Sequence, residues 1–252
     1  MDPRRPLIAV MTGAGISTAS GIPDYRGPRG VWRQDPTAEQ LVTVGPYLAD
    51  GDVRRRAWLM RREIGAHAAR PNAGHLALAE LERSGLPVRV LTQNVDGLHQ
   101  RSGLPAHKVI ELHGTAAQVR CVGCGARSTM AEALDRVTAG EEDPPCSACG
   151  GVLRPCTVMF GEPLDSTVIA QAEAVAQACD VFIAVGSSLQ VYPAAALPLI
   201  AREGGARLTI VNAEPTPYDE LAVEVIREPI STALPALVRR LIADATGATG
   251  QA

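Results

Sequence analysis

Two Cys-x-x-Cys pairs are the residues of this chain with the most definite chemistry. Cys121 and Cys124 form the first pair, and Cys146 and Cys149 form the second after a gap of 21 residues. Four thiolates at this spacing fill the tetrahedral shell of a structural zinc ion and leave no position open for substrate. Two disulfides, or a redox-active Cys-x-x-Cys, are the alternative interpretations. We expect zinc, because the chain shows no secretory signal pattern and its six cysteines then favour a reducing compartment.

A closed zinc shell cannot carry out a reaction, so a catalytic group must lie elsewhere. His113 stands eight residues before the first cysteine pair, and histidine titrates near neutral pH, as a general base should. Lys108 is the only lysine, which nearly excludes a Schiff base or a P-loop lysine from the protein itself. Cys156 and Cys179 fall outside the paired spacing, and we expect both to be small buried apolar residues.

The composition argues against several classes of partner. The chain has 252 residues and a formal net charge of −3, so it lacks the basic footprint of a nucleic-acid-binding protein. Its apolar runs are too short to span a membrane. We therefore expect a cytoplasmic monomer with no membrane and no specific nucleic-acid partner. The preference for arginine over lysine is typical of a GC-rich bacterial genome.

Apolar segments and helical segments alternate along the chain. Strands are expected at 7–11, 88–92, 108–112, 181–185, 208–211 and 223–226. Alanine- and leucine-rich helices are expected at 73–84, 165–179 and 194–203. This alternation predicts an α/β fold, a Rossmann-like, mostly parallel sheet with helices on both faces.

Two segments interrupt the alternation. Residues 36–70 are helical and rich in arginine, and residues 116–154 contain the cysteine pairs. We expect this helical insertion and this zinc-ribbon module to form a small second domain. The Rossmann-like domain is then discontinuous, and a frayed tail follows it; the domain ranges are 1–35, 71–115 and 155–243, and the tail is 244–252.

The first strand ends in a glycine turn, Gly13-Ala14-Gly15-Ile16-Ser17. Two glycines let the backbone approach a pyrophosphate, and the start of a following helix offers free N–H groups. The dehydrogenase fingerprint G-x-G-x-x-G fails, because Thr18 occupies the position of the third glycine. A hydride-transferring enzyme is therefore not expected, and a glycine turn without a ligand is the structural alternative.

Most of the other expected strands also end in polar residues. Ligands of an open parallel sheet bind beyond the carboxyl ends of its strands. Amides and hydroxyls gathered there suit the ribose hydroxyls and pyrophosphate of a nucleotide. The residues concerned are Gln93, Asn94, Asp96, His113, Ser187, Ser188, Asn212 and Glu214.

Taken in order, these motifs resemble the sirtuins, which are NAD-dependent protein deacylases. The resemblance extends from residue 7 to about 237, and it includes the four cysteines. The matching segments are 13–17, 20–26, 92–99, 111–114, 160–162, 186–189 and 211–212. It implies that NAD+ is consumed to remove an acyl group, mainly acetyl, from a lysine side chain. The implied products are free lysine, nicotinamide and O-acyl-ADP-ribose.

The resemblance also assigns roles to residues. His113 would be the catalytic base, and Asn94 would share the catalytic site. An acyl-lysine peptide would lie along Val158, Phe160, Gly161 and Glu162. One structural Zn²⁺ would be held by the four cysteines. The cofactor would contact Gly13, Ala14, Gly15, Ser17, Ile22, Asp24, Tyr25, Arg26, Gln93, Asn94, Val95, Asp96, Gly186, Ser187, Ser188, Asn212 and Glu214, with Ile230 near adenine by position only.

Departures from the family pattern bear on acyl choice. Tyr25 replaces the usual phenylalanine, and Gly186-Ser187-Ser188 replaces the commoner Gly-Thr-Ser. Sirtuins that prefer succinyl- or malonyl-lysine carry a Tyr-x-x-Arg pair, and here the corresponding residues are Trp58 and Arg61. Arg61 could pair with a carboxylate, but it also fits a solvated arginine-rich helical face. The segment 21–32 resembles the nuclear branch of animal sirtuins, which can prefer long acyl chains.

Two other functions fit the same scaffold. A mono-ADP-ribosyltransferase would use a protein nucleophile in place of the acyl oxygen. A non-enzymatic NAD sensor or zinc-ribbon interaction module would be expected to lack His113 or Asn94. Both residues are present, as is Phe160-Gly161-Glu162, so the deacylase is the favoured hypothesis.

Overall fold

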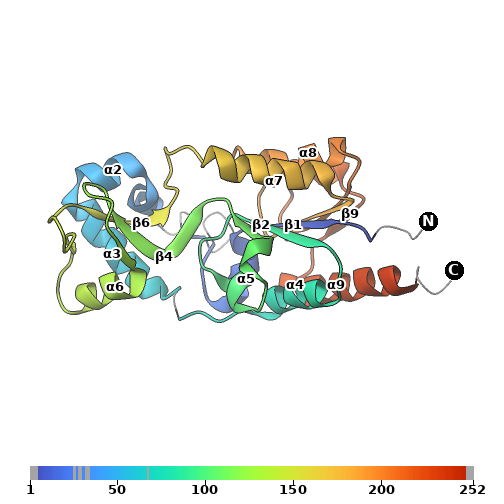
Figure 1. Cartoon of the computed structure of the whole chain (residues 1–252), viewed down its shortest axis with the longest axis horizontal. Coiled ribbons are helices and arrows are strands. Elements are labelled where there is room, and N and C mark those ends of the chain that lie inside the picture. Colours follow the sequence, from blue (N-terminus) through green and yellow to red (C-terminus); the bar gives the residue numbers. More distant parts are fainter. Residues whose placement is uncertain (1–4, 25–26, 28–29, 32–34, 67, 248–252) are drawn as a thin grey trace.

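The computed structural model describes residues 5–24, 27, 30–31, 35–66 and 68–247 (Figure 1). Its larger sheet has six parallel strands in the order β3-β2-β1-β7-β8-β9. The chain runs outward from β1 to β3 and then crosses back to β7 on the other side of β1. The carboxyl ends of β1, β2 and β7 therefore meet at a topological switch point, where α/β proteins bind ligands. The strands are β1 (Ile8–Thr12), β2 (Val88–Thr92), β3 (Val109–Glu111), β7 (Val181–Val185), β8 (Arg207–Val211) and β9 (Glu224–Ile226).

Helices cover both faces of this sheet (Figure 1). The side chains of β1 alternate between the two faces, as a strand requires. Ile8 and Val10 pack into one core with α4 (Ala73–Arg83) and α9 (Ile230–Gly247). Ala9 and Met11 pack into the other core with α7 (Ser166–Ala178) and α8 (Leu197–Glu203). Because both faces are buried, β1 is apolar throughout except for its last residue, Thr12.

The fold class predicted from the sequence is confirmed. The six strands and the helices α4 and α7 lie within one residue of the expected ranges. The expected helix 194–203 is formed by the short turn η4 (Ala194–Ala196) followed by α8, whereas α9 was not among the expected helices. One difference is at the C-terminal end, where α9 continues through residues 244–247, the start of the expected frayed tail. Short segments connect the main elements: η1 (Ala14–Ser20), α5 (Leu98–Arg101), η3 (Ala106–Lys108), η4 (Ala194–Ala196) and η5 (Asp219–Leu221).

The two interrupting segments pack against each other. The second contains a three-stranded antiparallel sheet in the order β5-β4-β6. Trp58, on the helix of the first segment, is fully buried among Val119, Leu134 and Leu153 of the second. The elements are η2 (Pro36–Val42), α2 (Val44–Ala49), α3 (Gly51–Ile64), β4 (Gly114–Cys121), β5 (Arg127–Thr129), α6 (Met130–Thr138) and β6 (Leu153–Thr157). The domain boundaries given above stay a prediction.

An ion pair connects the end of α4 to the approach to β3. The Nζ atom of Lys108 lies 2.6 Å from the Oε1 atom of Glu82, and both side chains are mostly buried.

Over the described part of the chain, every helix falls short of the length and hydropathy that a bilayer crossing needs.

Candidate active site

The glycine turn after β1 packs directly against the end of β7. A Cβ on Gly13 would lie 2.6 Å from the carbonyl oxygen of Gly186, and one on Gly15 would lie 2.7 Å from the Cα atom of Gly186. Gly186 itself has φ +61°, and a Cβ there would meet the Ile16 nitrogen at 2.5 Å. Only glycine fits these three positions. The result is a bare stretch of backbone at the switch point, which fits the close approach of a pyrophosphate.

Polar side chains of η1 and of the segment after β2 meet beside this turn. The Asn94 amide nitrogen donates hydrogen bonds to the Gly13 carbonyl and to the Ser17 hydroxyl, both at 3.1 Å. The Ser17 hydroxyl donates in turn to Asp96 Oδ2 at 2.7 Å. Asp96 Oδ1 also accepts the backbone N–H of Leu98, at the start of α5. This network fixes the orientation of the Asn94 and Asp96 side chains.

The ends of β2 and β7 are also joined by side chains. Gln93 Nε2 donates to the Ser187 hydroxyl oxygen at 2.8 Å, and the Leu189 N–H donates to the same oxygen at 3.2 Å. The structure therefore brings together predicted cofactor residues from three strand ends.

His113 lies at the junction between the two sheets, directly after β3 and before β4. Its Nδ1 atom is 2.8 Å from the Gln93 carbonyl oxygen. A carbonyl only accepts, so Nδ1 carries the proton and the neutral ring presents Nε2 as a base. Burial lowers the pKa of His113 from its usual value, and the hydrogen bond to Gln93 opposes part of this effect. The neutral form therefore predominates near neutral pH.

A buried polar network beneath the site was not foreseen from the sequence. The Thr12 hydroxyl donates to the Thr92 hydroxyl at 2.8 Å, and the Asn94 N–H donates to the same Thr92 oxygen at 3.0 Å. His99 Nε2, 2.8 Å from the Thr12 hydroxyl, is the donor that this arrangement requires. Burial lowers the pKa of His99 to about 3. His99 therefore supports the site from below, because three hydrogen bonds, through Thr12 and Thr92, connect its ring to Asn94.

His75 belongs to the same region, although no sequence motif assigns it a role. Its ring centroid is 5.1 Å from that of His99, and burial lowers the pKa of His75 to about 4. Its Nδ1 accepts the Asn72 N–H and so caps α4. The Asn72 amide reaches Ile16 and Ser20 of η1. The Pro71-Asn72 pair before a helix was the available signal, since asparagine is a common N-cap.

The other predicted cofactor residues lie around this centre or on the next strand along. Asp24 Oδ1 accepts the Gly27 N–H. Asn212, at the end of β8, donates to the Glu214 carbonyl, whereas the Glu214 side chain is exposed. Tyr25 and Arg26 lie outside the described residues. The remaining residues are partly buried, and no side-chain hydrogen bond within the described part of the chain defines a role for them; they are Ala14, Ile22, Val95, Ser188 and Ile230.

The predicted substrate segment, Val158 to Glu162, is hydrogen-bonded to His113 on one side and to the helical insertion on the other. The Val158 N–H donates to the His113 carbonyl at 2.8 Å. Phe160 forms a short parallel ladder with residues 42–44: its N–H donates to the Val42 carbonyl at 2.9 Å, and its carbonyl accepts the Val44 N–H at 3.0 Å. The Glu162 carboxylate is paired with Arg154, and its place along a bound peptide stays a prediction.

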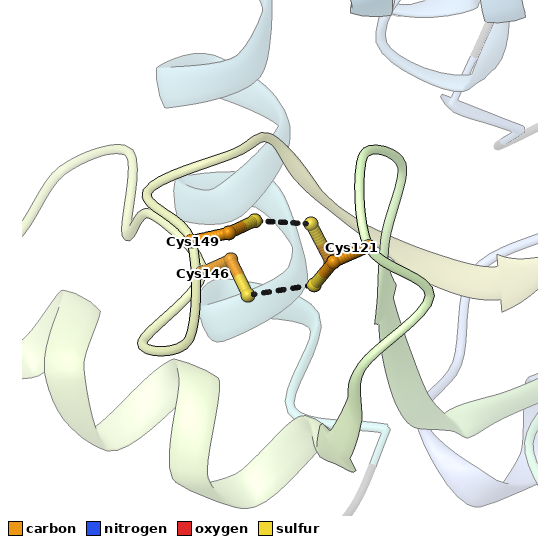
Figure 2. A group of neighbouring side chains, drawn as sticks. Cys121, Cys146 and Cys149 are labelled. Carbon is orange, nitrogen blue, oxygen red and sulfur yellow. Dashed lines mark hydrogen bonds between the residues drawn. The ribbon is translucent and has the colours of Figure 1, made fainter.

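The four cysteine sulfurs converge (Figure 2). They lie within 4.8 Å of one another, with 3.5 Å between the sulfurs of Cys121 and Cys149 and 3.7 Å between those of Cys124 and Cys146. Zn–S bonds of about 2.3 Å give tetrahedron edges of roughly 3.8 Å, whereas sulfurs in a disulfide are about 2.05 Å apart. The spacing fits one zinc ion and does not fit two disulfides.

Each cysteine pair forms the same turn. The Gly125 N–H donates to the Cys121 carbonyl, and the Gly150 N–H donates to the Cys146 carbonyl. Both glycines have positive φ, +74° and +73°, so glycine is favoured there. The second turn leads into β6, and the Val122 N–H of the first turn donates to the Val152 carbonyl just before β6 at 2.9 Å, which joins the two turns.

Trp58 and Arg61, the pair relevant to acyl choice, lie together on α3. The Arg61 guanidinium stacks 5.7 Å from the Trp58 ring and 5.5 Å from the Tyr47 ring, and it donates to the Ala57 carbonyl. The Tyr47 hydroxyl is engaged with the Leu153 carbonyl.

The parallel sheet, the glycine turn at its switch point and the four-cysteine module together define a sirtuin: the chain belongs to the Sir2 family, whose model matches residues 13–193. It is 65% identical over 237 residues to NAD-dependent protein deacetylase 2 of Streptomyces coelicolor, covering 94% of this chain and 98% of the relative. An NAD-dependent protein deacetylase of Rhodopseudomonas palustris is 44% identical over 229 residues, covering 90% and 89%. A Sir2 variant solved with a deacetylated p53 peptide and 3′-O-acetyl ADP-ribose superposes with a TM-score of 0.85 at 35% identity, covering 96% of this chain and 94% of that one.

Proposed function

We propose that this chain is an NAD-dependent protein-lysine deacetylase that yields free lysine, nicotinamide and O-acetyl-ADP-ribose. The names of the two bacterial relatives support this function, as do the product and peptide bound to the similar solved enzyme. The observation in this chain that carries it is the hydrogen bond that sets the tautomer of the neutral His113 ring. A hydrogen bond from Nδ1 to the Gln93 carbonyl leaves Nε2 free to accept a proton.

In this proposal, the residues at the switch point bind NAD+. The backbone of Gly13, Gly15 and Gly186 would lie against the pyrophosphate, and Ser187 would add a hydroxyl nearby. Bound NAD+ supplies a ribose carbon from which nicotinamide can leave. Asn94 and Asp96 would shape the surroundings of that ribose, because their side chains are already oriented by the Ser17 network. His113 Nε2 would remove a proton from a ribose hydroxyl.

The acetyl-lysine peptide would lie along the segment from Val158 to Gly161. Backbone pairing of this kind gives affinity with little demand on the peptide sequence. Acetyl is the acyl group that we favour, because Arg61 is engaged with Trp58, Tyr47 and a backbone carbonyl. A carboxylate at the end of a succinyl group would have to compete with these contacts.

Three further expectations belong to the proposal. The first is a cytoplasmic location in a bacterial cell, and the bacterial sources of two similar proteins support the bacterial origin. The second is a monomeric state. The third is that acyl-lysine proteins are the partners.

Mass spectrometry tests the function. The wild-type chain is incubated with NAD+ and matched acetyl-, succinyl- and long-chain-acyl-lysine peptides. We expect loss of the acetyl mass together with an equal amount of O-acetyl-ADP-ribose. His113→Ala should abolish both products, whereas His107→Ala, an exposed histidine on η3, should not. ADP-ribose attached to protein without deacylation would instead identify a transferase.

A further inference from the structure

An ion pair between a buried arginine and a partly exposed glutamate lies behind the proposed substrate segment and outside the cofactor site. Arg154 is on β6, and only 4% of its side chain is exposed. Its Nη1 and Nη2 atoms donate to Glu162 Oε1 and Oε2, each at 2.5 Å. This two-bond geometry fixes both planar groups relative to each other.

The pair closes a loop in the backbone. Glu162 Oε2 also accepts the Met159 N–H at 2.9 Å, and the Glu162 N–H donates to the Met159 carbonyl at 3.0 Å. Arg154 Nη2 donates a further bond to the Thr157 carbonyl at 3.0 Å. One guanidinium therefore holds both ends of the segment 157–162, and the tip of that segment contains Gly161 with φ +89°.

The same segment is attached to the rest of the site at only a few points. Val158 bonds to the carbonyl of His113, and Phe160 bonds to Val42 and Val44. The orientation of the backbone between these points depends on how the loop from Met159 to Glu162 is closed. Arg154 is thus placed to set the position of Val158 to Gly161 relative to His113 through its bonds to Thr157 and Glu162.

Stability alone does not account for this arrangement. The cost of removing two charges from water offsets much of the attraction in a buried ion pair. In addition, the Nε–H of Arg154 is buried and has no partner among the described residues. Arg154 holds the pKa of Glu162 below its usual value, so the pair stays ionised at neutral pH. What the pair supplies is a fixed geometry.

We infer that Arg154, through Glu162, is a positioning residue for the acyl-lysine peptide. The inference rests on the proposed deacetylase function. It assigns the pair to peptide affinity, and it separates this role from NAD+ binding and from proton transfer by His113.

The test compares Arg154→Lys and Glu162→Gln with Arg136→Lys. Lysine keeps the charge but cannot form two parallel bonds, and Arg136 forms an exposed ion pair with Glu141 that serves as the matched control. We call Arg154→Lys and Glu162→Gln the clamp variants. We expect each of them to raise the KM for an acetyl-lysine peptide about tenfold, because a tenfold change in affinity corresponds to the net free energy of about one well-formed hydrogen bond. The KM for NAD+ and kcat should change less than about twofold. The double variant should be little worse than either single variant, because both changes break one unit.

A second readout does not depend on turnover. Binding of a fluorescent acetyl-lysine peptide, measured by anisotropy with NAD+ absent, should weaken by the same factor in both clamp variants. Zinc content and the thermal midpoint of all variants are recorded in parallel. An unchanged peptide affinity in folded Arg154→Lys would overturn the inference. A rise in both KM values by the same factor as a fall in kcat would also overturn it. Failure of the wild-type chain to deacetylate would refute the proposed function, and the binding comparison would still decide the role of Arg154.

Discussion

Replacing Gly186 by alanine probes the contact that creates the proposed phosphate-binding surface. The new Cβ would lie 2.5 Å from the Ile16 nitrogen and 2.8 Å from the Cα atom of Gly15. Both neighbours are backbone atoms, so they cannot move aside as a flexible side chain would. Gly205→Ala is the matched control, because Gly205 also has positive φ, +92°, but has nothing within 4 Å of the added Cβ.

The two variants differ by the steric term alone. A left-handed backbone costs an alanine about 1–2 kcal/mol, and both variants bear this cost. Overpacking adds roughly 1–3 kcal/mol at Gly186 only. A difference of about 2 kcal/mol between the variants corresponds to about 6 °C in the thermal midpoint for a chain of this size.

Differential scanning calorimetry measures the two midpoints, and NAD+ titration of the folded variants measures the cofactor site. We expect Gly186→Ala to unfold about 6 °C below Gly205→Ala and to bind NAD+ more weakly, whereas Gly205→Ala should bind NAD+ normally. Equal midpoints for the two variants would mean that the turn after β1 can shift freely. Equal NAD+ affinities would remove this contact from the cofactor site.

Two further predictions concern the metal and the base. Cys121→Ser should lower zinc from one ion per chain to none and unfold the small sheet cooperatively, because structural zinc binding is coupled to folding; zinc-free protein with an unchanged thermal midpoint would contradict this. For His113, burial lowers the pKa, and the neutral ring is the active form, so activity is kept at high pH and lost as pH falls through the folded pKa. The acidic limb of kcat/KM should therefore have its midpoint below about 6.5, and a midpoint above that value would argue against His113 as the base.

The sequence predicts the sheet well because its strands are buried on both faces. A run such as Ile8 to Met11 is continuously apolar, and turn residues mark its end. The sequence predicts the zinc site equally well, because the spacing within each cysteine pair is a local pattern. The cofactor residues at the strand ends could be proposed because all parallel strands point their carboxyl ends to one edge.

The contacts that could not be predicted join residues that lie far apart in the sequence or in different elements. Nothing in the sequence distinguishes Arg154 from the other arginines, and only the folded chain shows that its guanidinium is buried against Glu162. Thr12 and Thr92 are 80 residues apart and meet because β1 and β2 pair in register. His75 looks like an ordinary helix residue until α4 packs near His99. No local pattern encodes these contacts.

The ion pair between Lys108 and Glu82 limits how readily this protein can itself be acylated. Apart from five histidines, its remaining basic side chains are arginines, whose guanidinium groups are far poorer targets for acylation than a lysine amine. The single lysine amine is mostly buried and engaged with a carboxylate. An enzyme that removes acyl groups from lysine therefore offers almost no such substrate of its own. It would not occupy its own active sites at high concentration, and its cationic surface charge would not be eroded by the modification it reverses.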